Sequence, residues 1–422
     1  MPLLTPPPLS NDCFALPRGV SWTPVETALA NLRKRLREVV GIETVPLEKA
    51  DGRVLARDHA AARSNPPGAN SAVDGYGFAF ADLPKGEGAM PLVEGRAAAG
   101  SSYDKSVPPG HAIRILTGAL LPQGVDTVVL EEDTTTDGVS VAFHAPKEKA
   151  NTRPAGEDIV KGSTALRAGA RLGPPELALA AAVGLSHVEV FEPLKVAVLS
   201  TGDELAQPSG TAPPSTTFDA NRPMLLSLIR RWGFEPIDLG AARDDRARLR
   251  AQFDRAAEAA HALLTSGGAS AGDEDHVSAL LSDAGALDEW RIALKPGRPL
   301  ALGLWRGMPV FGLPGNPVAA FVCSLIFARP ALHRLAGAEW TSPEAFTVPA
   351  AFAKSKRPGR REYLRARLTP KGGAEVFASE GSGRITGLAW STGLVELGDG
   401  AQEISLGDPV RYLPYASFGI GG

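Results

Sequence analysis

Short apolar runs alternate along residues 195–325 with segments whose apolar positions recur every three or four residues. The runs have the length of buried strands and lie at residues 196–199, 236–239, 262–265, 290–294 and 309–313. The segments between them have helical spacing, and one begins at Asn221, a residue type that favours the N-cap position. Strands that alternate with helices predict an open, doubly wound, mostly parallel sheet, and ligands bind to such sheets beyond the carboxyl ends of the strands.

The regions on either side have a different pattern. Residues 44–141 contain short apolar runs broken by Gly, Pro and Asp, which predicts a small β-rich domain. Short β segments return after Thr341 and predict a separate barrel or sandwich. Helical spacing over residues 25–40 predicts an amphipathic helix, with Thr23 as its N-cap and Glu26 completing a capping box.

Composition narrows the class of protein. A chain of 422 residues predicts two to four domains, and a net charge of -3 gives no general reason to bind nucleic acid or an anionic membrane. The only cysteines are Cys13 and Cys323, so a disulfide framework or a thiolate zinc site is not expected. No apolar run approaches the roughly 18 residues that span a bilayer, and the proline-rich start lacks the pattern of a secretion signal. These features predict a cytoplasmic protein.

A glycine-rich turn follows the predicted strand at residues 262–265. It consists of Ser266, Gly267, Gly268, Ala269 and Ser270, and paired glycines at a helix start let the backbone approach a phosphate. The acidic continuation 272–275, which ends in Asp275, would allow a divalent cation to bridge carboxylates to such a ligand. A solvated acidic helix start explains the same residues about equally well.

Other charged turns follow neighbouring strands of the same predicted sheet. Thr201, Gly202, Asp203 and Glu204 form one acidic turn, and Arg243, Asp244 and Asp245 form another, in which Asp245 also suits an N-cap. The cations of this region are Arg291, Lys295 and Arg298, which could neutralise ligand phosphates. A further strand-to-helix turn contains Pro314, Gly315 and Asn316. Without a Ser-His-Asp grouping, the pattern predicts a phosphorylated or nucleotide-bearing ligand held with a hard cation, rather than acyl transfer or redox chemistry.

The turns occur in an order that resembles the molybdopterin molybdenumtransferase family, called MoeA in bacteria and matching the C-terminal domain of gephyrin. The stretches that carry the resemblance are 71–76, 116–126, 153–158, 201–205, 219–221, 243–245, 266–275, 295–297 and 313–317. Weaker agreement continues through Gly359-Arg360 and Gly381-Ser382-Gly383. Arg291 and Arg298 stand where the family usually has lysine, which preserves the charge. Gly77 replaces a usual alanine, and Ser391-Thr392-Gly393 replaces a usual Ala-Asp-Gly.

The resemblance implies a multidomain α/β plus β chain. Its implied parts are a flexible tail at 1–20, a discontinuous helical domain at 21–46 and 147–194, an inserted β-rich domain at 47–146, a molybdopterin-binding α/β domain at 195–338 and a C-terminal β-barrel at 339–422. It also implies a homodimer, with Asp74 and Thr117 of one subunit acting at the sheet domain of the other. Molybdopterin adenylyltransferase and molybdoenzyme delivery proteins are further implied partners.

The implied reaction is insertion of molybdate into adenylylated molybdopterin with release of AMP, helped by magnesium. The catalytic positions that match are Asp74, Asp158, Glu204, Asp244, Asp275, Arg291 and Lys295, of which Glu204, Asp244 and Asp275 would hold Mg²⁺. The cofactor-binding positions are Thr117, Thr201, Gly202, Asp203, Ser266, Gly267, Gly268, Ser270, Arg298, Pro314, Gly315 and Asn316. Alternatives are a molybdopterin-binding scaffold without turnover, a tungsten-inserting paralogue, and the adenylyltransferase that acts in the preceding step.

Overall fold

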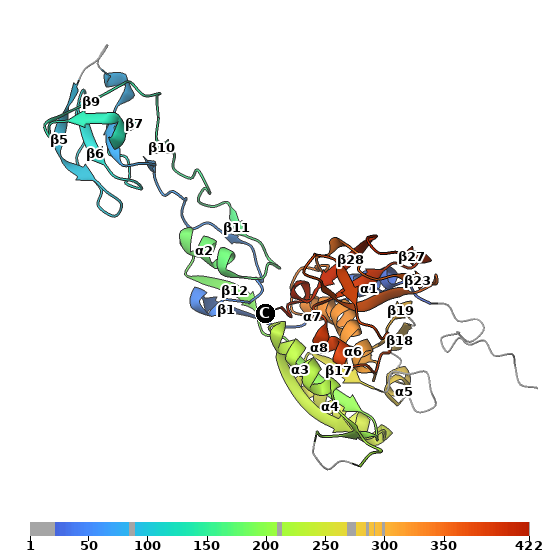
Figure 1. Cartoon of the computed structure of the whole chain (residues 1–422). Helices are drawn as coiled ribbons and strands as arrows, with labels where there is room; N and C mark the ends of the chain where they lie inside the picture. Colours follow the sequence, from blue (N-terminus) through green and yellow to red (C-terminus); the bar gives the residue numbers. More distant parts are fainter. Residues whose placement is uncertain are drawn as a thin grey trace, which may run out of the picture. The chain divides into compact units, whose positions relative to one another are not determined.

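The chain folds into two compact units in the computed structural model shown in Figure 1. The structure describes residues 22–83, 89–208, 213–267, 276–283, 287–290, 292–297 and 300–421. Unit 1 comprises Met1–Gly41 and Phe191–Gly422, and unit 2 comprises Ile42–Val190. Five predicted site residues lie outside the described residues, namely Gly268, Ser270, Asp275, Arg291 and Arg298, as does the predicted tail.

A six-stranded sheet forms the centre of unit 1. Its strands are β16 (Glu235–Ala242), β13 (Lys195–Thr201), β17 (Ala262–Ser266), β21 (Met308–Leu313), β20 (Leu300–Trp305) and β18 (Leu287–Trp290), in that spatial order. The first four are parallel, whereas β20 and β18 are antiparallel to their neighbours. The prediction of a mostly parallel sheet is confirmed. The predicted strand at 290–294 is wrong, since β18 ends at Trp290.

Helices cover both faces of this sheet, and the strand sequences explain why (Figure 1). In β13, Val196 and Val198 pack in a core with α3 and the helices after residue 317, whereas Ala197 and Leu199 pack on the other face with α4 and α5. Residues 196–199 of β13 are therefore apolar on both faces, as expected for a strand that helices cover on both sides. The helices are α1 (Val25–Arg35), α3 (Asn221–Arg231), α4 (Arg246–Ala259), α5 (His276–Asp283), α6 (Pro317–Cys323), η4 (Ser324–Ala328) and α7 (Arg329–Leu335).

Two of the three predicted helix starts are wrong in detail. The first helix has Pro24 as its N-cap without a side-chain cap, and it ends at Arg35 because Leu36 is extended. Asn221 is the first residue inside α3 rather than its N-cap, and Asp219 Oδ1 accepts the hydrogen bond from Arg222 N at 3.1 Å. The prediction for Asp245 is confirmed, since its carboxylate caps α4 by accepting from Arg248 N at 2.8 Å.

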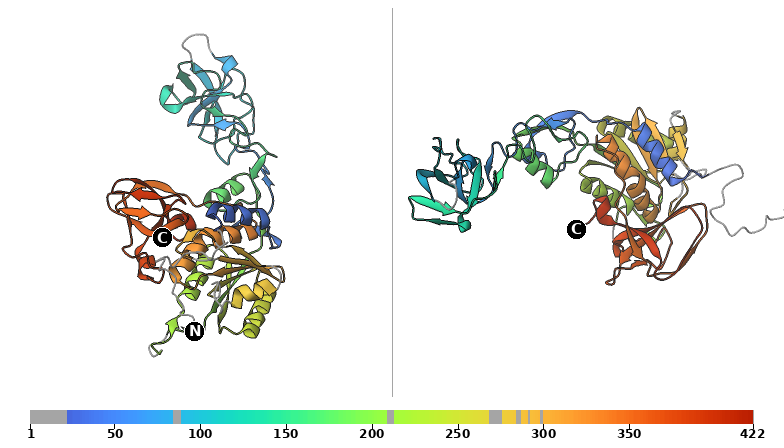
Figure 2. Two further views of the ribbon diagram at one scale, coloured as in Figure 1. Left: turned by 90° about the vertical axis from the view of Figure 1, so that its right-hand side faces the viewer. Right: turned by 90° about the horizontal axis from the view of Figure 1, so that it is seen from above.

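The helical stretch Pro317–Leu335 is long and apolar enough to cross a bilayer by length and composition, so the expectation that no run approaches that length is wrong. Of its most apolar window, 89% is buried inside the protein. Figure 2 shows the blue α1 beside the orange α7, and Val25, Ala28 and Leu32 pack in the same core as this stretch. These contacts make it the central core helix of unit 1.

The C-terminal part of unit 1 is built from further sheets. Its main sheet has the order β19-β24-β26-β28-β22, with β25 beside β24, and a second sheet pairs β23 with β27. The bounds are β19 (Leu294–Lys295), β22 (Phe346–Pro349), β23 (Lys354–Lys356), β24 (Arg361–Leu368), β25 (Ala374–Val376), α8 (Thr386–Trp390), β26 (Gly393–Leu397), β27 (Gln402–Ile404), β28 (Pro409–Pro414) and η5 (Tyr415–Phe418). Among the described strands the main sheet stays open, so it is a half-barrel rather than a closed barrel.

Unit 2 contains a β-rich part and a smaller part with one helix. The six-stranded sheet of the β-rich part has the order β7-β4-β6-β5-β9-β8 and surrounds a core that includes Tyr76 and Phe78. Its elements are β3 (Asn70–Ser71), β4 (Gly75–Phe78), η2 (Phe80–Asp82), β5 (Ala89–Ala97), β6 (Ala112–Ile115), β7 (Thr127–Leu130), η3 (Glu131–Asp133), β8 (Thr134–Thr136), β9 (Ser140–Phe143) and β10 (Thr152–Arg153). The predicted β-rich domain is confirmed as a β-rich part.

The smaller part of unit 2 has its own apolar core, which includes Leu55, Leu172 and Val190. Its elements are β1 (Ile42–Pro46), η1 (Leu47–Lys49), β2 (His59–Ala60), β11 (Thr164–Leu166), α2 (Pro174–Ala182) and β12 (His187–Phe191). Helix α1 belongs to unit 1 and packs in its core, although it was expected in the same discontinuous domain as these elements. The finer division into five parts stays a prediction.

Candidate functional site

The strand order places one end of the unit 1 sheet at a topological switch point. The chain leaves β13 through α3 to reach β16 on one side, and then crosses through α4 to β17 on the other side. The turns after β13 and β17 therefore lie next to each other at the carboxyl edge, where open α/β sheets bind ligands. Thr201, Gly202, Asp203, Ser266 and Gly267 lie in or beside these turns, as predicted.

The backbones of these two turns approach each other closely. Gly267 has a φ of +97°, and a Cβ there would lie 2.4 Å from the carbonyl oxygen of Thr201. Only glycine allows this approach without displacing the backbone. On the other side of the turn, a Cβ on Gly315 would lie 3.7 Å from Gly267 Cα. Three of the predicted motifs therefore meet at one place.

Asn221 ties these turns together. Its Nδ2 donates to Ser266 Oγ at 2.7 Å and to the carbonyl oxygen of Gly315 at 2.7 Å, and the residue is 6% exposed. Asn221 Oδ1 and Thr201 Oγ1 are buried and make no hydrogen bond within the described part of the chain. Buried polar atoms are nearly always paired, so both suit a polar ligand bound against the turns.

Carboxylates gather at the same edge. Asp203 Oδ1 accepts a hydrogen bond from Asp244 N at 3.2 Å, which links the turn after β13 to the turn after β16. Burial raises the pKa of Asp244, and the negative charges of Asp203 and then Glu204 raise it further, although His276 acts in the opposite direction. Asp203 and Glu204 are therefore close enough to Asp244 for their charges to act on it. Oxygen ligands of this kind suit a hard cation such as Mg²⁺.

The described residues alone do not complete a metal site. Within the ranges that the structure describes, no three His, Cys, Asp or Glu side chains are arranged to hold one ion. Asp275, the third expected magnesium ligand, lies outside those ranges. The structure thus brings Glu204 and Asp244 into one electrostatic cluster and leaves the predicted metal set untested.

The turn at Pro314, Gly315 and Asn316 joins this edge to the C-terminal part of unit 1. Gly315 contacts the switch-point turn, and two residues after Asn316 the amide of Val318 donates to Ser382 O at 3.2 Å. Val318 also lines a pocket of about 190 Å³ together with Lys295 and Glu380. The acidic edge and this pocket are thus connected through one turn.

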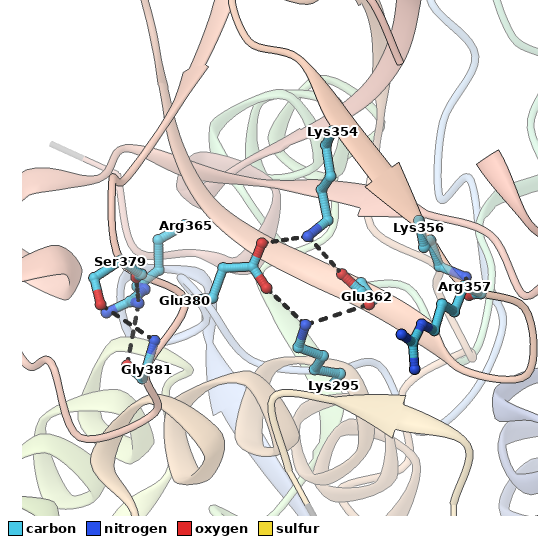
Figure 3. Close-up of polar contacts among 9 residues, drawn as sticks. All are labelled: Lys295, Lys354, Lys356, Arg357, Glu362, Arg365, Ser379, Glu380 and Gly381. Carbon is cyan, nitrogen blue, oxygen red and sulfur yellow. Dashed lines mark hydrogen bonds and ion pairs between the residues drawn. The ribbon is translucent and has the colours of Figure 1, made fainter. Parts of the chain in front are cut away.

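Lys295 lies in the pocket within a cluster of four charged side chains (Figure 3). Its Nζ is 2.6 Å from Glu380 Oε2 and 3.4 Å from Glu362 Oε1. Lys354 pairs with the same two carboxylates, with Nζ 3.2 Å from Glu362 Oε2 and in contact with Glu380 Oε1. Lys295 is therefore a paired cation, held by residues of the C-terminal part.

Lys354, Glu362, Glu380 and the pocket residue Arg365 are functional candidates that the sequence analysis missed. The only signal was weak family agreement at Gly359-Arg360 and Gly381-Ser382-Gly383, which flank three of them. Their chemistry becomes visible only when β19 (Leu294–Lys295) pairs with β24 (Arg361–Leu368) and places Lys295 opposite Glu362. The pairing partners are 67 residues apart in sequence.

Unit 2 contains a separate group of predicted residues. Asp74 Oδ1 accepts hydrogen bonds from Thr117 N at 2.7 Å and Thr117 Oγ1 at 2.6 Å. These bonds, the side-chain bond first, hold the pKa of Asp74 below its ordinary value. Asp158 lies apart from this pair and accepts from Asn65 Nδ2 at 3.0 Å. Gly75 is required beside Asp74, because a Cβ there would lie 1.8 Å from Val129 O.

Comparisons with known proteins cover nearly all of this architecture. Residues 23–184 match the family described as "MoeA N-terminal region (domain I and II)". Residues 197–334 match "Probable molybdopterin binding domain", and residues 347–415 match "MoeA C-terminal region (domain IV)". The molybdopterin molybdenumtransferase of Haemophilus influenzae is 33% identical over 399 residues, which are 93% of this chain and 98% of that protein. The chain belongs to the MoeA family.

Two further MoeA relatives agree with this placement. The molybdopterin molybdenumtransferase 2 of Mycobacterium tuberculosis is 34% identical over 382 residues, 87% of this chain and 94% of its own length. A crystal structure described as the molybdopterin biosynthesis MoeA protein from Pyrococcus horikoshii superposes with a TM-score of 0.77 at 30% identity, over 94% of this chain and 99% of the other. The fold is therefore a MoeA-like multidomain fold.

Proposed function

We propose that this MoeA-family chain is a transferase that inserts molybdenum from molybdate into adenylylated molybdopterin and releases AMP, in the synthesis of the molybdenum cofactor. The observation that carries the proposal is the meeting of three family motifs at the switch point, where Asn221 holds the turns at Ser266 and Gly315. Buried polar atoms at this edge are oriented by the sheet and suit a ligand rich in hydrogen-bonding groups.

The turns bind and orient the pterin nucleotide. The amides after β13 and β17 lie at strand ends, and the glycine at 267 keeps side-chain atoms away from them. Thr201 and Asn221 each offer a buried oxygen to the ligand. We assign Gly268, Ser270 and Arg298 to the same function by family position. Holding the phosphoanhydride in a fixed orientation lowers the barrier because less freedom is lost in the transition state.

The carboxylates Glu204 and Asp244, with Asp275, are the residues that would hold Mg²⁺. Their oxygen atoms fit a hard cation. Burial first, and then the negative charges of Asp203 and Glu204, raise the pKa of Asp244, and a bound cation would offset both effects. When bound, the ion supplies charge neutralisation at the pyrophosphate. The protein's own part is to keep Glu204 and Asp244 together at one edge of the sheet.

The cations bind the oxyanions. Lys295 lies in the pocket beside the turn at Asn316, and Arg291 belongs to the same set by family position. Their charges would position molybdate and stabilise the negative charge that develops as the phosphoanhydride breaks. Pro314 and Gly315 connect this pocket with the acidic edge, which lets one substrate contact both.

The remaining parts of the proposal concern assembly and location. Asp74, Thr117 and Asp158 belong to unit 2. We propose that in a homodimer Asp74 and Thr117 act at the sheet domain of the other subunit, and that Asp158 is a further acidic site residue by family position. Thr117 already holds the carboxylate of Asp74 in one orientation. We also propose a cytoplasmic location and contacts with molybdopterin adenylyltransferase and molybdoenzyme delivery proteins, and the family placement supports both.

The proposal is tested by incubating the purified chain with adenylylated molybdopterin, magnesium and molybdate, and measuring AMP. Glu204→Ala and Asp275→Ala should each lower AMP release by about 100-fold or more, as expected when a transition-state charge partner is removed. Glu235→Ala is the matched control, because Glu235 is an exposed carboxylate at the opposite, amino end of the same parallel strands.

The outcomes distinguish the alternatives. Pterin binding without AMP release under any oxyanion would refute the transferase proposal and leave a scaffold. AMP release that needs tungstate rather than molybdate would identify a tungsten-inserting paralogue. An adenylyltransferase is disfavoured, because the family match continues through the C-terminal region at 347–415.

A further inference from the structure

The charge cluster of Lys295, Lys354, Glu362 and Glu380 contains two carboxylates that differ in exposure and in the element that carries them. Glu362 lies on β24 (Arg361–Leu368) and its side chain is only 11% exposed. Glu380 lies in the loop between β25 and α8, and its side chain is 44% exposed. Both contact the same ammonium groups of Lys295 and Lys354 (Figure 3). One carboxylate is therefore part of the sheet, whereas the other reaches the lysines from a loop.

The backbone of this loop is held in place by hydrogen bonds from the side chain of Arg365. Arg365 donates to the carbonyl oxygens of Ser379 and Gly381, which lie on either side of Glu380 (Figure 3). It also donates to the carbonyl oxygen of Arg384. The guanidinium is itself largely buried, because the whole residue is 4% exposed. The loop backbone is fixed and the Glu380 side chain is partly exposed, so the carboxylate can move away from the lysines by rotation about its side-chain bonds alone. No rearrangement of the C-terminal part is needed.

Glu380 is negatively charged at neutral pH. Burial alone would raise its pKa, but the hydrogen bonds from Lys295 and Lys354 outweigh burial and keep the pKa below its ordinary value. Burial acts to lower the pKa of Lys354, and its bonds to Glu380 and Glu362 more than reverse this. The two lysines and two glutamates therefore sum to zero charge, +2 and -2. Without the Glu380 carboxylate the same cluster would carry +1.

The pocket beside the cluster is the size of a small solute. Its volume is about 190 Å³, and its lining includes Lys295, Lys354, Glu380 and Arg365. Liquid water occupies roughly 30 Å³ per molecule, so the pocket has room for a tetrahedral oxyanion with some water. An anion that enters must share the two ammonium groups with Glu380 or replace it.

We propose that Glu380 is an internal competitor for the oxyanion, so that only an anion with more charge than one carboxylate displaces it from Lys295 and Lys354. A dianion such as molybdate or sulfate gains more from the two ammonium groups than Glu380 does, whereas chloride gains less. Glu380 thereby sets a charge threshold for the pocket and is a specificity-determining residue. The inference rests on the proposed function, because it takes the pocket as the oxyanion site.

The test is isothermal titration of the full-length protein at neutral pH with molybdate, sulfate and chloride separately. Glu380→Gln keeps the size of the side chain and removes its charge. We expect molybdate and sulfate to bind this variant about 5- to 30-fold more tightly, since two partly exposed ion pairs no longer have to be broken. Chloride, which should not compete in the wild type, should become a measurable competitor of molybdate.

The matched control is Glu375→Gln. Glu375 is also a half-exposed carboxylate of the C-terminal part, paired with Arg367, but it does not line the pocket. This control should leave both oxyanion affinities unchanged. Glu380→Asp, which keeps the charge on a shorter side chain, should give an intermediate affinity and still exclude chloride. A loss of fold cannot produce tighter binding, so the gain separates competition from a structural role.

The results also separate this inference from the proposed function. Equal or weaker oxyanion binding by Glu380→Gln, with AMP release intact in the wild type, would overturn the competitor role alone. Absence of AMP release by the wild type would overturn the proposed function, whatever the titrations show. If Glu380→Gln does not fold, molybdate and sulfate affinities of Glu380→Asp that equal those of the wild type would likewise overturn the inference.

Discussion

The position of Asn221 yields the sharpest test of the switch-point geometry. Asn221→Ala removes two hydrogen bonds of 2.7 Å each, to Ser266 Oγ and Gly315 O, at a site that is 6% exposed. A buried hydrogen bond contributes about 1 kcal/mol net, so the loss should be about 2 kcal/mol. For domains of roughly this size, that lowers the melting temperature by about 4–8 °C.

Tryptophan fluorescence is well suited to this measurement. All 6 tryptophans lie at positions that belong to unit 1, so thermal unfolding followed by their emission reports on the unit that contains Asn221. The same variant should lower kcat/KM for AMP release at least tenfold, because the freed turns no longer hold the substrate in one orientation. Asn31→Ala, at an exposed position of α1, is the control and should change neither quantity.

If Asn221→Ala melts within about 1 °C of the wild type and keeps its kcat/KM, the two hydrogen bonds do not hold the turns. If it melts several degrees lower but keeps kcat/KM, Asn221 is structural only, and the turns at Ser266 and Gly315 do not orient the substrate.

Two further predictions concern neighbouring carboxylates. Asp245→Ala removes the N-cap of α4 and should cost about 1 kcal/mol of stability. AMP release should persist, because this carboxylate is engaged with Arg248 N, and an activity loss as large as that of Glu204→Ala would contradict this. Thr117→Val should raise the pKa of Asp74 toward its ordinary 3.8, measured by carboxyl carbon NMR, because the first cause of the depression is lost. Because the pKa of Asp74 is lower in the folded than in the unfolded protein, its ionised carboxylate stabilises the wild type above the unfolded pKa, and this stabilisation disappears as pH falls through the folded pKa. Identical pKa values of Asp74 in the wild type and in Thr117→Val would refute the role of Thr117.

Local sequence patterns predicted the sheet of unit 1 well. Val196 to Leu199 and Ala262 to Thr265 are apolar at every position, which is typical of strands covered on both faces. Asp245 was correctly predicted as an N-cap because the cap forms within four residues. The carboxyl-edge location of the Thr201 and Ser266 turns also followed from the alternation of strands and helices.

Long-range contacts explain what the patterns missed. Asn221 is a residue type that favours the N-cap position, but its side-chain amide donates to Ser266 and Gly315, which are 45 and 94 positions away. The side chain of Asp219 instead accepts the hydrogen bond from Arg222 N in the first turn of α3. Leu294 and Lys295 form a strand with the C-terminal sheet rather than with the neighbouring β18. The partners of Lys295 depend on that pairing, so no local window around residue 295 contains them.

Unit 2 is one continuous stretch of chain, whereas unit 1 is assembled from both sides of it. The core of unit 1 contains Val25 and Phe418, and Trp232 Nε1 donates to Phe418 O at 2.8 Å. During synthesis at about 5–20 residues per second, residues 42–190 can fold while the ribosome still has the rest of unit 1 to translate. While residues 42–190 are being translated, the apolar side chains of the segment at Val25 have no core to pack against, because their partners in unit 1 lie after residue 190. The connectivity therefore allows the inserted unit 2 to fold first, whereas unit 1 can complete its core only after residue 418 has emerged.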